Sequence, residues 1–173
     1  MSVPLRHRTH RAPIWPYSWR VPSDQARLYQ RVLVGYVESG VAPHYIEIAR
    51  ALSWPTDKAR EVLHQVVGKG LAMWLHPGTD LIASCAPFSS LPTLYRISID
   101  GVPHGYAQCG LEVLAVSWLF PGHEVQIDSL CPDCGEPISL AMSDGELLSI
   151  SPHSVVAHTN VPFSKWRGQL PLA

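Results

Sequence analysis

The sequence contains no apolar run approaching the roughly 20 residues of a membrane-spanning helix, so we expect no membrane partner. Its N-terminal region lacks the apolar stretch of a secretory signal, which favours a cytoplasmic protein. Cysteine is scarce, and four cysteines in 173 residues do not suggest a disulfide framework, so we expect reduced thiols. Charged residues make up only 16% and the formal net charge is −1, which argues against a general nucleic-acid binder.

Apolar residues make up 46% of the chain, enough to build one globular domain or two small ones. The first 31 residues concentrate positive charge, with six arginines against one acid, Asp24. Residues 1–22 also contain four prolines, so we expect an arm that is poorly ordered unless it docks on a surface. Its aromatic residues, Trp15, Tyr17 and Trp19, give it a means of docking, for example as a lid over a site.

Residues 23–86 have the pattern of a winged-helix-like domain. Apolar residues recur at helical spacing from Asp24 to Gly40, and a second, short helix is expected after Pro43. A third helix should begin at residue 56 or 57 and end at Gly68 or Gly70. The apolar segments 71–75 and 81–83 flank a turn sequence, which predicts a hairpin that would form the wing.

Residues 87–173 are expected to form a second, mixed α/β domain, which makes the chain an α+β protein. Its first residues, 87–93, are typical of a linker. The patterns that follow predict a helix over 106–119 and strands over 94–99, 125–130, 137–142, 146–150 and 154–159.

Cys109 and Glu112 are the first candidate site. On a helix, residues three apart share a face, and a helix N-terminus would favour a Cys109 thiolate. Thiolates prefer soft metals, and a partly buried Glu112 with a raised pKa could act as a general acid. The alternative is that Cys109 is a small buried hydrophobic residue and Glu112 is solvated.

Cys131 and Cys134 form a CxxC turn followed by glycine, which is half of a zinc knuckle. A structural zinc site has four ligands, so Cys109, Cys85, His153 or His158 would have to complete it. The alternatives are a redox dithiol, which the preceding strand disfavours, or a plain structural turn.

The third helix, residues 56–69, could contact DNA in a winged-helix regulator. It offers three basic residues but also two acids, a poor balance for phosphate contacts, so we favour a structural or dimerisation role.

Several segments, in this order and spacing, resemble the alkylmercury (organomercurial) lyase family over roughly residues 28–160. They are Ala49-Arg50-Ala51-Leu52-Ser53-Trp54-Pro55, Ala86-Pro87-Phe88-Ser89, Tyr106-Ala107-Gln108-Cys109-Gly110-Leu111-Glu112 and Cys131-Pro132-Asp133-Cys134-Gly135-Glu136-Pro137. The resemblance implies a winged-helix-like three-helix domain followed by a mixed α/β domain of the alkylmercury lyase type. It also implies protonolysis of a carbon–mercury bond in the second domain.

By this resemblance, Cys109 is the first catalytic cysteine and Glu112 stands where the family has an aspartate. Cys131 falls near a further, structural cysteine. The family's second catalytic cysteine has no counterpart, because no cysteine follows Cys134. Cys131 and Cys134 are therefore the candidates for the second thiol, and Cys109, Cys131 and Cys134 are the expected metal ligands.

The sequence therefore predicts a lyase-like protein that binds a small organometal or a soft metal ion (Hg, Zn or Cu) and needs no cofactor. The same Cys109–Glu112 pair would also suit a divergent enzyme with another substrate. The other reading is a metal-binding protein without turnover, either a chaperone or a metal-sensing winged-helix regulator. The oligomeric state is not predicted.

Overall fold

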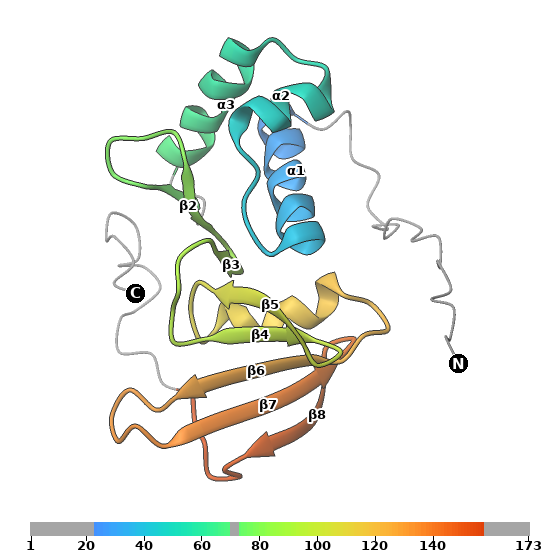
Figure 1. The fold of residues 1–173 in the computed structure, drawn as a ribbon, viewed down its shortest axis with the longest axis vertical. Helices are drawn as coiled ribbons and strands as arrows, with labels where there is room; N and C mark the ends of the chain where they lie inside the picture. Colours follow the sequence, from blue (N-terminus) through green and yellow to red (C-terminus); the bar gives the residue numbers. More distant parts are fainter. Residues whose placement is uncertain (1–22, 70–72, 158–173) are drawn as a thin grey trace, which may run out of the picture.

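The computed structural model describes residues 23–69 and 73–157. Three helices lie at one end of the molecule, and a long antiparallel sheet runs from beneath them to the other end (Figure 1). The expected α+β class is confirmed. The predicted arm at residues 1–22, with its three aromatic residues, and His158 lie outside the described residues.

The three helices form where the apolar spacing predicts them. Helix α1 (Asp24–Ser39) begins after Ser23, whose hydroxyl accepts the N–H of Ala26, and it ends at Gly40 in the left-handed conformation. Helix α2 (Tyr45–Leu52) begins with a reciprocal capping pair between His44 and Glu47. Helix α3 (Thr56–Gly68) follows Pro55. Their inward faces share one core, formed mainly by Leu28, Val32, Tyr36, Ile48, Leu63 and Val66.

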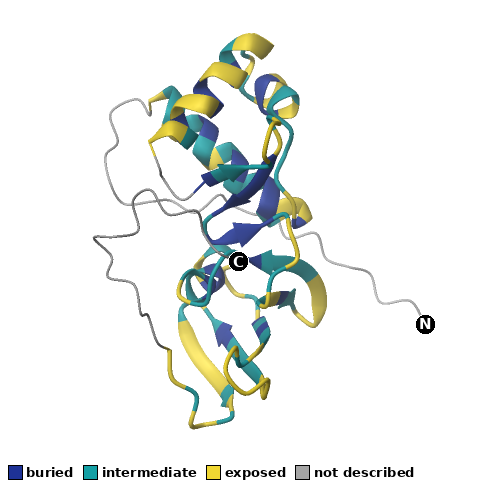
Figure 2. Ribbon diagram, turned by 90° about the vertical axis from the view of Figure 1, so that its left-hand side faces the viewer, coloured by how far each residue is buried: buried dark blue, intermediate teal, exposed yellow. Residues whose placement is uncertain are grey.

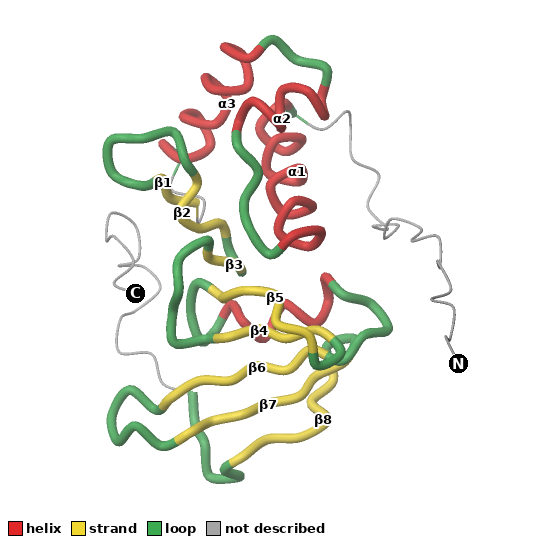
Figure 3. Tube along the Cα trace, viewed as in Figure 1, coloured by secondary structure: helices red, strands yellow, loops and turns green. Residues whose placement is uncertain are grey.

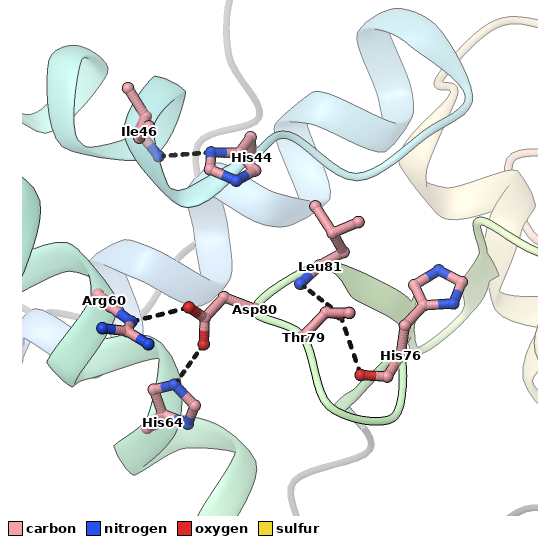
Figure 4. A network of polar contacts seen from close by, with 8 residues as sticks. All are labelled: His44, Ile46, Arg60, His64, His76, Thr79, Asp80 and Leu81. Carbon is pink, nitrogen blue, oxygen red and sulfur yellow. Dashed lines mark hydrogen bonds and ion pairs between the residues drawn. The ribbon is translucent and has the colours of Figure 1, made fainter.

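The hairpin expected after the third helix is also present, as strands β1 (Met73–Leu75) and β2 (Ile82–Cys85). Helices and hairpin thus occur in the predicted order, while the winged-helix assignment itself stays a prediction. Asp80, in the loop between the two strands, contacts α3 through Arg60 and His64, each at 2.7 Å (Figure 4). These contacts fix the hairpin against the helix.

The sheet contains eight strands in the order β1-β2-β3-β5-β4-β6-β7-β8, and every neighbouring pair is antiparallel. The remaining strands are β3 (Phe88–Ser89), β4 (Arg96–Ile99), β5 (Val102–Ala107), β6 (Val125–Leu130), β7 (Pro137–Ser143) and β8 (Glu146–Ser151). Buried residues gather where the helices meet β2 and β3, whereas β7 is mostly half-buried and β8 mostly exposed (Figure 2).

The predicted linker at residues 87–93 was wrong for Phe88 and Ser89. Both residues are buried and form strand β3, which pairs with β2 on one side and β5 on the other. Two residues are too few to show a periodicity, so sequence patterns cannot reveal such a strand. The sheet therefore continues across the proposed boundary between residues 86 and 87, and the division into two domains stays a prediction.

The helix predicted over 106–119 was wrong in its first part. Tyr106 and Ala107 belong to β5, where they pair with β3, and a 3-10 helix, η1 (Glu112–Leu119), starts only at Glu112 (Figure 3). The segment is apolar almost throughout, and such a run does not distinguish a buried strand from a buried helix. The strand predicted over 154–159 is absent from its described part, residues 154–157.

No helix within residues 23–69 and 73–157 is both long and apolar enough to cross a membrane.

Candidate functional site

Cys109 and Glu112 lie together at the junction between the end of β5 and the start of η1. The Cys109 thiol donates to Glu112 Oε2 at 3.4 Å, and the Glu112 backbone N–H donates to the sulfur at 3.4 Å. The Cys109 carbonyl accepts the N–H of Val113 at 3.0 Å, which ties the loop to the first turn of η1. The structure thus brings the two predicted residues into direct contact, with both side chains partly buried.

Both groups hold their protons more tightly than usual. Burial raises the pKa of the Cys109 thiol, and the hydrogen bond from the Glu112 backbone only partly opposes this effect. Burial likewise raises the pKa of Glu112, partly offset by the hydrogen bond from Cys109. Cys109 precedes the short 3-10 helix and does not lie in its first turn, so the condition for stabilising its thiolate at a helix N-terminus is not met. The raised pKa values mean that both groups keep their protons to higher pH than exposed groups of the same type.

Tyr95 and Thr93 hold the Cys109 loop on the sheet. The Ala107 N–H donates to the Tyr95 carbonyl at 2.9 Å, and the Thr93 hydroxyl donates to the Ala107 carbonyl at 2.7 Å. Gly110 lies against the Tyr95 ring, since a Cβ atom at Gly110 would come within 2.8 Å of the Tyr95 hydroxyl oxygen. Glycine therefore permits the close approach that positions the thiol.

Cys85 is a second thiol beside this pair, and it is fully buried at the end of β2. The Tyr29 hydroxyl, from α1, donates to the Ala86 carbonyl at 3.2 Å and also hydrogen-bonds the Cys85 thiol. Burial raises the pKa of Cys85 to about 12, the hydrogen bond with Tyr29 opposes this rise, and the charge of Glu112 adds to it. Cys85 and Cys109 therefore both interact with the same carboxyl group.

Sequence reasoning considered Cys85 only as a helper for the CxxC turn and did not consider Tyr29. Tyr29, Cys85 and Glu112 come from α1, β2 and the start of η1, so no spacing along the chain could have linked them. Their association depends on how the helices pack against the sheet.

Cys131 and Cys134 lie in the turn between β6 and β7. The turn is closed by hydrogen bonds from the Gly135 N–H to the Cys131 carbonyl and from the Cys131 N–H to the Glu136 carbonyl, both at 2.9 Å. Backbone N–H groups of Cys134 and Asp133 lower the pKa of the Cys131 thiol by stabilising its thiolate. This hydrogen-bonded turn could present two thiolates to a soft metal.

The structure does not bring Cys109, Cys131 and Cys134 together as one ligand set. Within residues 23–69 and 73–157, no group of three or more His, Cys, Asp or Glu side chains is arranged to hold a metal ion. The two thiol segments nevertheless leave the sheet from the same end, because β5 and β6 run in the same direction on either side of β4 (Figure 1). The metal-ligand roles of the three cysteines stay predictions.

The fold and the site together define an α+β protein that holds a thiol and a carboxylic acid in contact at the end of an antiparallel sheet. Residues 88–169 match the family model for alkylmercury lyase (MerB). The matched segment covers a little under half of the chain, is similar to the alkylmercury lyase family, and contains Cys109, Glu112, Cys131 and Cys134.

Ten chains of solved structures match this fold. One is described as the crystal structure of the mercury-bound form of MerB2, with a TM-score of 0.62 and 19% sequence identity. The match covers 77% of this chain and 62% of that chain, so the present chain spans less than two thirds of that protein. The comparison with curated proteins found no match.

Proposed function

We propose that this protein is an organomercurial lyase in which Cys109 captures the organomercury cation and Glu112 protonates the carbon atom. The observation that carries the proposal is the 3.4 Å contact between the Cys109 sulfur and the Glu112 carboxyl, within the segment that matches the lyase family. The two chemical functions that protonolysis requires, a soft ligand for mercury and an acid beside it, are in contact.

In the first step, the Cys109 thiol releases its proton to solvent water and its sulfur binds the mercury atom of R–Hg⁺. In the second step, the Glu112 carboxyl gives its proton to the carbon atom, and the electron pair of the carbon–mercury bond becomes the new carbon–hydrogen bond. The products are the hydrocarbon R–H, a Glu112 carboxylate and Hg(II) bound to Cys109. No resident cofactor takes part in either step.

The electrostatics of the pair suit this order of events. Burial raises the pKa of Glu112, which increases the fraction of the acid form available near neutral pH. The contact distance places the carboxyl beside the atom to which mercury would bind, so the carbon atom of a bound organomercury group would lie within reach. Proximity of this kind replaces a collision between separate reactants.

The test is release of benzene from phenylmercury acetate, measured by gas chromatography in the presence of excess free thiol. Cys109→Ser should abolish release, whereas Glu112→Gln should keep the phenylmercury adduct, visible by native mass spectrometry, without releasing benzene. Glu146→Gln, at an exposed position on β8, is the matched control and should release benzene at the unsubstituted rate. Full benzene release by the Glu112→Gln variant would remove Glu112 from the mechanism.

A divergent enzyme that uses the same pair on another substrate would behave differently in this assay. It would bind phenylmercury at Cys109 and release no benzene, even with Glu112 intact. That result would keep the pair as a site and move the search to other substrates.

The CxxC turn supports a second candidate function, a soft-metal-binding protein without turnover. Its supporting observation is the lowered pKa of Cys131, which the N–H groups of the turn produce. This function predicts that Cys131→Ser and Cys134→Ser each lower the affinity for Zn(II), Cu(I) or Hg(II), with no hydrocarbon released. Unchanged metal affinity in both variants would make the CxxC segment a structural turn only.

The regulator version of that candidate receives little support from helix α3. Lys58 forms an ion pair with Asp24 at 2.7 Å, and Arg60 forms one with Asp80 at 2.7 Å. Both cations are thus already paired within the chain, and contacts with DNA phosphates would compete with these pairs.

A further inference from the structure

We propose that Cys85 is the second sulfur ligand of this site, and that it binds Hg(II) or another soft metal together with Cys109. The proposal deepens the proposed lyase function by naming the thiol that receives the metal product. It supplies the second thiol from strand β2, in the part of the chain that precedes the family match at residues 88–169.

The register of the sheet places Cys85 on the face that leads to Cys109. Cys85 pairs with Phe88 across β2 and β3, and Phe88 pairs with Ala107 across β3 and β5. Residues directly opposite one another in a sheet project to the same face, and all three are buried. Cys109 follows Ala107 by two residues, and the hydrogen bond from the Gln108 N–H to the Pro87 carbonyl at 2.8 Å keeps this stretch beside the β2–β3 turn.

The surroundings of Cys85 also support its pairing with Cys109. Glu112 contacts the Cys109 sulfur at 3.4 Å and is close enough to Cys85 for its charge to raise the pKa of that thiol. Tyr29 also lies beside Cys85, with its hydroxyl hydrogen-bonded to the Ala86 carbonyl at 3.2 Å.

The transfer balances in atoms and charge. After protonolysis, Cys109 carries Hg(II) and Glu112 is a carboxylate. The Cys85 thiol gives its proton to that carboxylate while its sulfur binds mercury, which yields Cys85–S–Hg–S–Cys109 and restores the Glu112 acid. Two thiolates satisfy Hg(II) in a linear arrangement, so two ligands are enough. The described residues contain no group of three or more His, Cys, Asp or Glu side chains arranged to hold a metal ion, and this site does not require one.

The CxxC thiols are the competing candidates for the second ligand. Cys134 is exposed and Cys131 only partly buried, and both belong to the β6–β7 turn, which strand β4 separates from β5. Cys85, in contrast, ends the strand that pairs with β3, and β3 pairs directly with the strand that leads to Cys109.

The test uses mercuric chloride, so that its outcome does not depend on carbon–mercury cleavage. The full-length reduced protein receives one equivalent of Hg(II), is digested with pepsin at acid pH, and is analysed by mass spectrometry for mercury-bridged peptide pairs. We expect a bridged pair that contains Cys85 and Cys109. A pair that joins Cys131 to Cys134, or either of them to Cys109, would overturn the proposal.

Variants provide a second measurement, read as mercury retention against excess dithiothreitol. Cys85→Ala should lower retention by at least the roughly tenfold to hundredfold that loss of even an outer-shell partner costs a metal site. The Cys131→Ser/Cys134→Ser double variant separates the two candidate second ligands: a smaller loss of retention than in Cys85→Ala supports Cys85, and an equal or larger loss would overturn the proposal. If Cys85→Ala fails to fold, peptide mapping of the unsubstituted protein still decides the question.

The two proposals fail in different ways. A Cys85–Hg–Cys109 bridge without benzene release from phenylmercury would support the metal site and refute the lyase. Benzene release with mercury left on the CxxC thiols would support the lyase and refute the role of Cys85.

Discussion

The backbones of Gly40 and Gly105 are in direct contact, and they join the end of helix α1 to strand β5. A Cβ atom on Gly105 would lie 2.9 Å from the Gly40 carbonyl oxygen, and one on Gly40 would overlap the His104 carbonyl oxygen. Beside this contact, His104 Nε2 hydrogen-bonds the Tyr36 carbonyl at 2.8 Å. Strand β5 leads directly to Cys109, so this contact helps to set the position of the helices relative to the site.

Replacing Gly40 by alanine should therefore destabilise the protein more than backbone strain alone explains. The positive φ of 76° should cost about 1–3 kcal/mol for a residue with a side chain, and the collision with β5 should add about 1–3 kcal/mol. The measurement is urea unfolding. Gly122→Ala is the matched control, because Gly122 has the same φ of 76° and nothing within 4 Å of its would-be Cβ. Equal losses in the two variants would contradict a tight contact between helix and strand.

The helices could be predicted because their signals are local. Apolar spacing, the left-handed stop at Gly40 and the residues around Pro43 all lie within a few positions of the features that they determine. Strand β3 has no such signal, because two buried residues form a strand only when β2 and β5 lie on either side of them. Sequence patterns therefore predicted α1, α2 and α3 well, began the helix of residues 106–119 too early, and missed β3, the strand that joins the two halves of the sheet.

The candidate site divides in the same way. Cys109 and Glu112 are three residues apart, and this spacing brings them together even though the turn that joins them is not the expected helix. Cys85 and Tyr29 reach Glu112 only through tertiary packing. A sequence alone could not show that the buried thiol of β2 lies close enough to Glu112 for the charge of that carboxyl to raise its pKa.

Glu112→Gln should stabilise the protein at neutral and alkaline pH. Folding raises the pKa of Glu112, so the stability that its protonated form contributes is fully present below the ordinary value of 4.5 and is lost as pH rises through the folded pKa. A glutamine cannot ionise and avoids that loss. In urea unfolding from pH 4 to pH 8, the free energy of unfolding of the variant should rise relative to that of the unsubstituted protein as pH rises.

The control for this effect is Glu146→Gln on the exposed strand β8. Its free energy of unfolding should follow that of the unsubstituted protein across the same pH range. A constant difference between the Glu112→Gln variant and the unsubstituted protein from pH 4 to pH 8 would show that the Glu112 carboxyl is not desolvated by the fold.

Asp80→Asn should loosen the hairpin from helix α3. The hydrogen bond from His64, followed by the contact with Arg60, lowers the pKa of Asp80 (Figure 4). The stability that this carboxylate contributes is present above the ordinary pKa of 3.8 and is lost as pH falls through the lower folded value. The variant should therefore have a lower Tm than the unsubstituted protein at pH 6, and the two should converge in strong acid.

A double-mutant cycle tests whether His64 is the partner through which Asp80 stabilises the protein. Combining Asp80→Asn with His64→Ala should cost less than the sum of the two single changes, because each removes the same contact. Additive losses would assign the effect to something other than the Asp80–His64 pair.

The four cysteines should react with iodoacetamide in a fixed order, because the thiolate is the reactive form. The lowered pKa of Cys131 and the exposure of Cys134 place the CxxC turn first, and the raised pKa of Cys109 places it later. Cys85 should react last. With a pKa of about 12 against an ordinary 9.0, its thiolate fraction at neutral pH is about a thousandfold smaller than that of a free thiol. Peptide mapping after timed pulses gives the order, and all four should react alike in guanidinium chloride. Early labelling of Cys85 would mean that the contact with Tyr29 opens easily.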